Sequence, residues 1–324
     1  MFSQWLIDSY CKKRKENLLI KIFNRMLLII RKIIISINSS ILIQYRLENV
    51  NLTLPFRHEL PIIKKVFSQY DSAIGRIPKY LTKKYSDFQA IDIGANVGDT
   101  AIIIKSQLDI PILCIEADDF YFHLLQLNTN NIKGISHEHS FVGDIDDNNL
   151  QLLSYKGTAR LVKSNEGNNH VHFKSLLGII EKHKDFDNVK FLKIDTDGFD
   201  CKIIRSNINF LKRNQPVIFF EYDPYFLHLA GDDGLSVFDS LIQIGYKKLL
   251  VYDNTGSFLI STETTNRKVI EELNNYFTGR DSVMYMDICA FHNIDSDIAE
   301  IVRESELEFQ KSKRNYQMKH STLI

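Results

Sequence analysis

The sequence has 324 residues, enough for one large domain with an appendage or for two domains. Its 44% hydrophobic and 25% charged residues exclude a mostly disordered chain, and its 14 glycines and 6 prolines exclude collagen-like and low-complexity sequences. The 40 basic and 40 acidic side chains balance, which disfavours a globally basic nucleic-acid-binding protein.

The charge is sorted to the two ends of the chain. Residues 1–35 hold eight basic and two acidic side chains, and residues 311–324 hold four basic and no acidic ones. Since the net charge is zero, the body between these ends carries about −10. An acidic body also disfavours a nucleic acid as the partner.

Cysteine usage and hydropathy indicate a cytoplasmic protein. The four cysteines are far apart and form no CxxC pair, so we expect reduced thiols rather than disulfides or a zinc module. These cysteines are Cys11, Cys114, Cys201 and Cys289. The basic cluster at residues 12–15 comes late for a signal peptide, and the longest uncharged run nearby, residues 33–45, is shorter than the ~20 residues that a spanning helix needs.

The first expected element is a helix over residues 18–35. Lys21, Arg25 and Lys32 are four and seven residues apart, so they share one side of this helix, and apolar side chains cover the rest. Such a helix can lie in an anionic membrane surface, which predicts peripheral contact with the inner face of a membrane through residues 12–35. Amphipathic helices more often pack on the body of the protein or on a partner chain, which is the alternative interpretation. The sequence leaves both interpretations open.

Four segments are expected along the chain. Residues 1–45 form the basic helical extension, and residues 46–89 form a lead-in of short strands and helices, in which LENVNLTLPF alternates like a strand and ends at Pro55. Residues 90–295 form the main domain, and residues 296–324 form a C-terminal helix with a basic tail.

From residue 90 onward, short apolar runs alternate with stretches of helical period. The predicted strands cover residues 90–93, 110–115, 135–142, 190–194, 217–221, 248–252 and 284–291. The predicted helices cover residues 120–128, 173–183, 201–211, 235–244 and 267–277. This alternation is typical of a Rossmann-like α/β fold, with a mostly parallel sheet and helices on both of its faces. In such a sheet, ligands bind beyond the carboxyl ends of the strands.

The first predicted strand ends in the loop Asp92-Ile93-Gly94-Ala95-Asn96-Val97-Gly98-Asp99-Thr100, which opens a helix. The glycines permit close approach of a ligand, the N–H groups of the helix start can hold a carboxylate, and Asp92 can hold an ammonium group. The loop therefore suits an amino-acid moiety, and its expected binding residues are Asp92, Gly94, Ala95, Asn96, Gly98 and Thr100. A dinucleotide-binding GxGxxG loop is disfavoured, because Asn96 replaces the second glycine and Asp99 would face a pyrophosphate.

The next two strands are also followed by acids. Glu116, 24 residues after Asp92, suits a bidentate hydrogen bond to two ribose hydroxyls, although an exposed cap shows the same pattern. Asp144 follows the third strand in a Gly-Asp pair, which can reach an adenine amino group or can be ordinary turn chemistry.

Carboxylates crowd the ends of the fourth and fifth strands. Asp200 is typical of a helix N-cap, whereas Asp195 and Asp197 are expected to face solvent or a ligand. Glu221 and Asp223 follow the fifth strand, with His228 shortly beyond. An acidic mouth of this kind suits a cationic, ribose-bearing ligand better than a bare polyphosphate.

Four motifs in this order give the sequence a resemblance to a known family. AIDIGANVGDT, CIEADDFYFHLLQLN, FLKIDTDGFDCKIIR and IFFEYDP look like the motifs of the FkbM-type S-adenosylmethionine-dependent methyltransferases. The resemblance covers roughly residues 50–295 and implies a seven-stranded sheet and O-methylation of a hydroxyl, often on a sugar or a natural product.

The resemblance also implies roles for individual residues. Asp92, Gly94, Asn96 and Gly98 match the cofactor loop, Glu116 matches the ribose-binding acid, and Asp195 matches the strand-end acid near the methyl group; these correspondences are by motif only. The family pattern reads Asp-x-Glu-Gly where this chain has Asp195-Thr196-Asp197-Gly198, so the second carboxylate is one methylene shorter.

Methylation of an alcohol requires a group that takes its proton or a metal that lowers its pKa. We expect Asp197 or Glu221 to be the base, with His228 as a third candidate. A Mg²⁺ ion held by Asp195, Glu221 and Asp223 is a minority alternative.

The expected function is S-adenosylmethionine-dependent O-methylation of a small molecule or glycan, with a sugar of a polysaccharide or glycolipid as the acceptor. Two alternatives remain: an NAD-type Rossmann oxidoreductase, and a non-catalytic scaffold that binds S-adenosylmethionine. The oligomeric state is not predicted.

Overall fold

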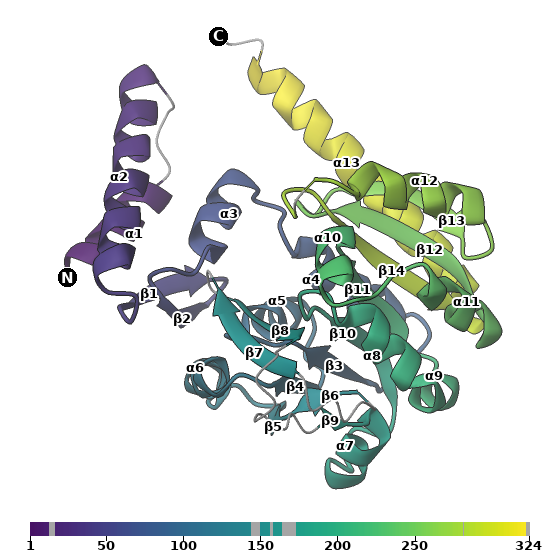
Figure 1. Ribbon diagram of the computed structural model, residues 1–324. Coiled ribbons are helices and arrows are strands. Elements are labelled where there is room, and N and C mark those ends of the chain that lie inside the picture. Colours follow the sequence, from purple (N-terminus) through teal and green to yellow (C-terminus); the bar gives the residue numbers. More distant parts are fainter. Residues whose placement is uncertain (13–16, 144–149, 156–157, 164–172, 281, 322–324) are drawn as a thin grey trace.

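A computed structural model describes residues 1–12, 17–143, 150–155, 158–163, 173–280 and 282–321. Its centre is an eight-stranded sheet with helices on both faces (Figure 1). The strand order is β13-β12-β14-β11-β10-β3-β4-β5. The strands are β3 (Gln89–Ile93), β4 (Ile112–Glu116), β5 (Ile135–His139), β10 (Val189–Ile194), β11 (Val217–Tyr222), β12 (Tyr246–Asp253), β13 (Phe258–Glu263) and β14 (Met286–His292).

The predicted Rossmann-like α/β class is confirmed. Strands β5, β4, β3, β10 and β11 run parallel, and β14 is antiparallel to both of its neighbours, β11 and β12. Every residue of β3, β4 and β11 is buried, as strands covered on both faces require. The sheet has one strand more than the seven predicted, because β13 forms a hairpin with β12 and extends the edge with a largely exposed sequence.

Two hydrophobic cores lie on the two faces of the sheet. One contains side chains from α7 (Leu176–Lys182), α8 (Asp200–Ser206), α9 (Ile208–Asn214), α11 (Ser236–Gln243) and α12 (Arg267–Phe277). The other contains side chains from α4 (Ser72–Leu81), α5 (Asp99–Gln107), α6 (Asp119–Thr129) and α13 (Ser296–Ser321). Successive residues of β3 enter opposite cores, Ala90 the second and Ile91 the first, as the two-residue period of a strand requires.

Several element boundaries differ from those predicted. The helix predicted over 201–211 is broken into α8 and α9 at Asn207, whose carboxamide accepts a hydrogen bond from the backbone N–H of Leu176. The helix predicted over 173–183 begins only at Leu176, because Ser175 caps it by accepting from the N–H of Gly178. The strand predicted over 135–142 is divided into β5 and β6 (Phe141–Val142), which pairs with β9 (Phe173–Lys174).

The N-terminal quarter packs on the main domain through a third core. It contains α1 (Phe2–Cys11), α2 (Leu18–Ile37), β1 (Leu42–Leu47), β2 (Val50–Pro55) and α3 (Leu60–Val66). Its core side chains meet Ile102 and Ile103 of α5 and Tyr121 of α6. The predicted helix over 18–35 is thus found as α2, whereas α1 was not predicted. Strand β1 crosses the boundary predicted between residues 45 and 46, because both strands of the β1–β2 hairpin belong to the same core.

The remaining elements are short or lie at the ends of the chain. They are the hairpin of β7 (Leu150–Tyr155) and β8 (Thr158–Lys163), α10 (Pro224–Leu229) and the 3₁₀ turn η1 (Asn293–Asp295). The C-terminal helix expected after residue 295 is α13. All four cysteines are free. Within the residues described, no helix combines the length and the apolar character needed to cross a membrane.

Candidate active site

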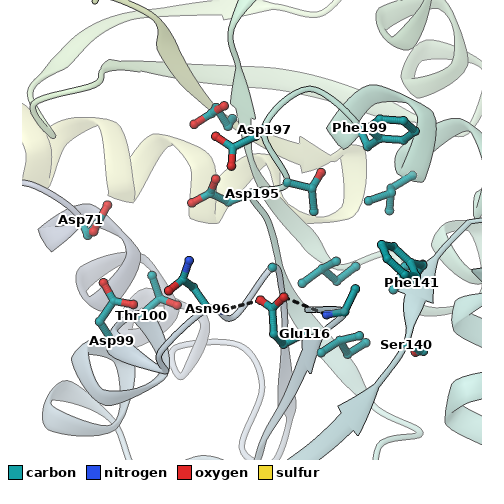
Figure 2. Close-up of a pocket in the computed structure, with 18 of the residues that line it drawn as sticks. Asp71, Asn96, Asp99, Thr100, Glu116, Ser140, Phe141, Asp195, Asp197 and Phe199 are labelled. Carbon is teal, nitrogen blue, oxygen red and sulfur yellow. Dashed lines mark hydrogen bonds between the residues drawn. The ribbon is translucent and has the colours of Figure 1, made fainter. Parts of the chain in front are cut away.

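The carboxyl ends of the parallel strands border a cavity that encloses about 1130 Å³, including the solvent at its mouth. It lies where the strand order reverses, between the loops that follow β3 and β10. Much of its lining comes from these two loops, from the ends of β4 and β11, and from the lead-in segment before β3. Figure 2 shows acidic side chains on one side of this space and aromatic rings on the other.

The loop after β3 depends on glycine for its path. Gly94 has φ of +72°, and a Cβ on it would lie 1.8 Å from the carbonyl oxygen of Asp195, so glycine allows the two strand-end loops to touch. Of the predicted loop residues, Gly94, Asn96 and Thr100 line the cavity. Ala95 and Gly98 do not: Ala95 is buried in the core, and Gly98 precedes the first residue of α5. Their part is to shape the loop.

Asp92 does not line the cavity, so its predicted role in holding a ligand's ammonium group is wrong. Its carboxylate is fully buried, accepts a hydrogen bond from the Thr100 hydroxyl, and has an oxygen 3.1 Å from Nζ of Lys193. The register of the parallel strands β3 and β10 explains this pairing, because it makes Lys193 the direct neighbour of Asp92. The ammonium group that Asp92 holds belongs to the protein itself.

Lys193 connects this buried pair to the cavity. Its Nζ donates to the carbonyl oxygen of Gly94 at 3.0 Å and lies 3.5 Å from a carboxylate oxygen of Asp195, which lines the cavity. Burial alone would lower the pKa of Lys193, but Asp92 and Asp195 outweigh it and raise that pKa. The side chain therefore stays charged and joins the ends of β3 and β10.

Glu116 is held by the backbone at the centre of the cavity. One carboxylate oxygen accepts from the N–H of Asn96 at 2.8 Å (Figure 2). The other accepts from the N–H groups of Ala117 and Asp118 at 2.9 and 2.8 Å. Burial raises the pKa of Glu116, and these three hydrogen bonds oppose the rise. A carboxylate offers about four lone-pair directions, so one remains for a ligand. The position predicted for the ribose-binding acid is thus at the cavity.

The side of the cavity beyond Glu116 is largely apolar. Ile115 and Val142 line it together with Phe141 and Phe173, whose ring centroids are 5.6 Å apart. Phe199 lies on the same side in Figure 2. This lining suits a flat aromatic ligand group. Asp144, predicted to reach an adenine amino group, lies outside the described residues.

The opposite side of the cavity is acidic. Asp71, Asp99, Asp195 and Asp197 line it, and Figure 2 shows them around one space. Burial, reinforced by the charge of Asp99, raises the pKa of Asp71 to about 8. This side is therefore built to take up protons or positive charge.

Glu221 is a buried acid of the lining. Its side chain is 7% exposed, and its Oε1 has no hydrogen-bond partner among the described residues. It also stands directly opposite Asp287 on the antiparallel strand β14. Burial, followed by the charges of Asp195 and Asp197, raises the pKa of Glu221 well above its usual range. An unpaired buried carboxylate at a cavity is a candidate proton acceptor.

The structure separates the remaining predicted residues from the cavity. His228, in the last turn of α10, does not line it, so the structure does not bring this predicted residue to the cavity. Asp223 is the N-cap of α10, where it accepts from the N–H of Tyr225 at 2.9 Å. Within the described part of the chain, no three His, Cys, Asp or Glu side chains are grouped to hold a metal ion. The Mg²⁺ site of Asp195, Glu221 and Asp223 is therefore not assembled.

Four of the lining residues that the sequence analysis missed lie away from the strand-end motifs. His58, Tyr70 and Asp71 come from the lead-in, and Tyr285 immediately precedes β14. His58 accepts from the N–H of Leu60 at Nδ1, so its Nε2–H donates to Oδ1 of Asn96 at 3.3 Å. Burial lowers the pKa of His58, which keeps it neutral and in this tautomer. No sequence pattern marks these residues, because they lie away from the strand-end motifs.

Comparison with solved structures finds several methyltransferases. The METTL16 MTase domain has 12% identity and a TM-score of 0.41, and the match covers 76% of this chain and 74% of that chain. The O-methyltransferase from Bacillus cereus in complex with SAH has 11% identity and a TM-score of 0.37, over 70% of this chain and 81% of that chain. The precorrin-6y C5,15-methyltransferase from Geobacter metallireducens GS-15 has 11% identity and a TM-score of 0.35, over 64% and 81%.

No curated protein matches the sequence. A family model, described as the methyltransferase FkbM domain, matches residues 92–247, which run from β3 into β12 and contain the strand-end loops of the cavity. The resemblance inferred from the motifs is thereby confirmed over residues 92–247, which match the methyltransferase FkbM domain.

Proposed function

We propose that the chain transfers a methyl group from S-adenosylmethionine to a hydroxyl group, on a sugar of a polysaccharide or glycolipid. The family match supports methyl transfer. The observation that carries the rest is the division of the cavity, which has an apolar side, a fixed carboxylate at its centre and an acidic side. A nucleoside suits the apolar side and the fixed carboxylate. A cation beside a polar acceptor suits the acidic side.

The residues present fit this cofactor. The Phe141 and Phe173 rings suit its adenine, and the remaining lone pair of Glu116 suits a ribose hydroxyl. The first turn of α5, capped by Gly98 without a side-chain hydrogen bond, suits its carboxylate. Asp195 and Asp99 suit its positive charge.

When bound, S-adenosylmethionine supplies an already activated methyl group, so the protein's own part is alignment and proton removal. We assign proton removal to Glu221, because one oxygen of its buried carboxylate has no hydrogen-bond partner among the described residues and burial raises its pKa, so it binds a proton more readily than an exposed carboxylate. A positive charge beside Glu221 favours its carboxylate form in the loaded site. Asp197, which lines the same side, is the alternative base.

The acceptor end suits a polyhydroxylated molecule. Tyr70, Asp71 and Tyr285 add hydroxyl and carboxylate groups around Glu221, which can donate and accept the hydrogen bonds of sugar hydroxyls. The carboxylates of Asp71 and Glu221 also disfavour acceptors rich in phosphate, because like charges repel.

Two measurements test the proposal. Isothermal titration with S-adenosylhomocysteine, with NADH as the comparison, is expected to show binding of the first and not of the second. Incubation with S-adenosylmethionine and a panel of mono- and oligosaccharides, followed by mass spectrometry, is expected to show a sugar that gains one methyl group. Binding of NADH alone would support an oxidoreductase, and cofactor binding without any methylated sugar would support the non-catalytic scaffold.

A further inference from the structure

Helix α2 presents an apolar stripe to solvent along its whole length. Six large apolar side chains, each between 49% and 80% exposed, recur at spacings of three and four residues and so share one face of the helix. They are Leu18, Ile22, Met26, Ile29, Ile33 and Ile37. A continuous apolar surface of this length is unusual on a protein and marks an interaction site.

The other face of α2 fixes the helix to the body. Leu27 is buried in the third core, and Arg31 is only 4% exposed. The Arg31 guanidinium pairs with Glu59 at 3.0 Å and donates to the carbonyl oxygens of Phe56 and His58. Because these contacts set the rotation of the helix, the stripe faces away from the molecule, at whose edge α2 stands (Figure 1).

Positive charge lines one flank of the stripe. Lys21, Arg25 and Lys32 are exposed along this flank, and α2 contains no acidic residue. The neighbouring helix α1 adds two stacked aromatic rings, Phe2 and Trp5, which are 55% and 50% exposed. An apolar face with a basic flank and exposed aromatic rings is the composition of helices that lie in the interface of anionic membranes.

We propose that α2 docks on an anionic lipid surface, with the apolar stripe in the interface and the basic flank at the lipid headgroups. Charge complementarity favours lipid over a second copy of the chain. An antiparallel pair of α2 helices would set basic flank against basic flank, and a parallel pair would set it against apolar side chains. Docking of this kind is independent of the reaction that the cavity catalyses.

Flotation of the full chain with vesicles tests this docking. Vesicles of equal parts phosphatidylcholine and phosphatidylglycerol are expected to carry the protein upward, and vesicles of phosphatidylcholine alone to carry far less. At about 1 kcal/mol for each basic residue near the surface, the Lys21→Gln/Arg25→Gln/Lys32→Gln variant is expected to bind the anionic vesicles roughly a hundredfold more weakly. The variant Lys212→Gln/Arg213→Gln/Lys268→Gln, which removes three exposed charges from the main domain, is the matched control and is expected to bind unchanged.

The apolar stripe is tested separately by Ile22→Ser/Ile29→Ser/Ile33→Ser, which leaves the anchoring contacts of Leu27 and Arg31 in place. This variant is expected to lose flotation while it keeps the thermal unfolding midpoint of the wild type. Equal flotation of this variant and the wild type would overturn the proposal. A second outcome would also overturn it: the wild-type chain binds neither kind of vesicle and is a dimer in light scattering, whereas the serine variant is a monomer. The stripe would then bind a second copy of the chain.

Discussion

Glu116 and Glu221 are two buried carboxylates of one cavity, and they are held in opposite ways. Three backbone N–H groups surround Glu116, whereas Glu221 has an oxygen without a hydrogen-bond partner among the described residues and stands opposite Asp287. A carboxylate that is already hydrogen-bonded can bind a ligand without rearranging. One that is unsatisfied gains most from a proton or a cation.

The difference assigns the two halves of the cavity to different tasks. The Glu116 half is preorganised, which suits recognition of a cofactor that is the same in every turnover. The Glu221 half stores unfavourable electrostatic energy, which suits a group that must take a proton from an acceptor. Substitutions on one side of the cavity at a time test this contrast.

The largest effect is expected from Glu221→Gln. Glutamine keeps the shape of the side chain but cannot take a proton, so methyl transfer should fall by about 10²–10⁴-fold. The affinity for S-adenosylhomocysteine should stay within about twofold, because the cofactor half is untouched. Turnover measured as release of S-adenosylhomocysteine, with titration calorimetry for affinity, checks both values.

The same assay on Asp197→Asn separates the two candidate bases, since both side chains line the acidic half. With Glu221 as the base, this variant should lose less than tenfold of its turnover. A larger loss than that of Glu221→Gln would move the base to Asp197. Wild-type turnover should also rise with pH, because the raised pKa of Glu221 keeps it protonated at the acid end of the range.

Removal of the Lys193 charge is expected to leave a buried, ion-paired acid without its cation. Lys193→Met leaves the fully buried Asp92 without its cation, which typically costs about 3–5 kcal/mol of unfolding free energy. Urea denaturation measures this loss, and Lys212→Met, at an exposed position, is the control. A loss below about 1 kcal/mol would mean that Asp92 does not depend on Lys193.

A smaller effect, on binding alone, is expected from Glu116→Ala. The loss of charged hydrogen bonds should weaken cofactor binding by about 1.5–3 kcal/mol, or roughly 10–150-fold. Calorimetry with S-adenosylhomocysteine checks the value, and unfolding by urea shows whether the loop remains folded. Unchanged affinity would remove the ribose assignment.

The smallest effects are expected on the free energy of unfolding. A third buried acid, Glu138, provides the comparison for Glu221. Burial opposes ionisation of Glu138, but hydrogen bonds from Lys174, Lys182 and His183 outweigh it and lower its pKa from 4.5 to about 2. Its stabilisation is therefore present above pH 4.5 and is lost as the pH falls toward about 2. Glu138→Gln should lower the unfolding free energy by about 1–3 kcal/mol at neutral pH.

Glu221→Gln should act in the opposite direction. Because the pKa of Glu221 is raised in the folded state, its ionisation disfavours folding as the pH rises above the usual range of the group. The glutamine variant should thus be more stable than the wild type at neutral pH, by about 1 kcal/mol, and equally stable in acid. A destabilised variant would show that Glu221 has a structural partner.

Strand-end motifs predicted the fold and much of the cavity because each motif is contained within a few consecutive residues of the sequence. The acids and glycines after β3, β4, β10 and β11 read as strand ends within a few residues, and parallel strands bring these ends together. Pairing across strands is not local, so the neighbour of Asp92 was missed. Lys193 is about a hundred residues further along the chain, and only the register of β3 and β10 makes it a partner.

The acceptor half was less predictable for the same reason. Tyr70 and Asp71 reach the cavity only because the lead-in segment lies beside the loops at the carboxyl ends of the strands. Tyr285 reaches it only because β14 runs antiparallel and begins at those ends. His228 illustrates the converse error, since it is close to Glu221 in sequence but α10 carries it away from the cavity.

A crystal structure of the chain grown with S-adenosylhomocysteine tests the central assignment most directly. We expect the ribose hydroxyls within hydrogen-bonding distance of Glu116, the adenine beside Phe141 and Phe173, and the sulfur on the side of Asp195. A nucleoside bound elsewhere, or a cavity closed by rearranged side chains with Glu116 out of reach, would contradict the account.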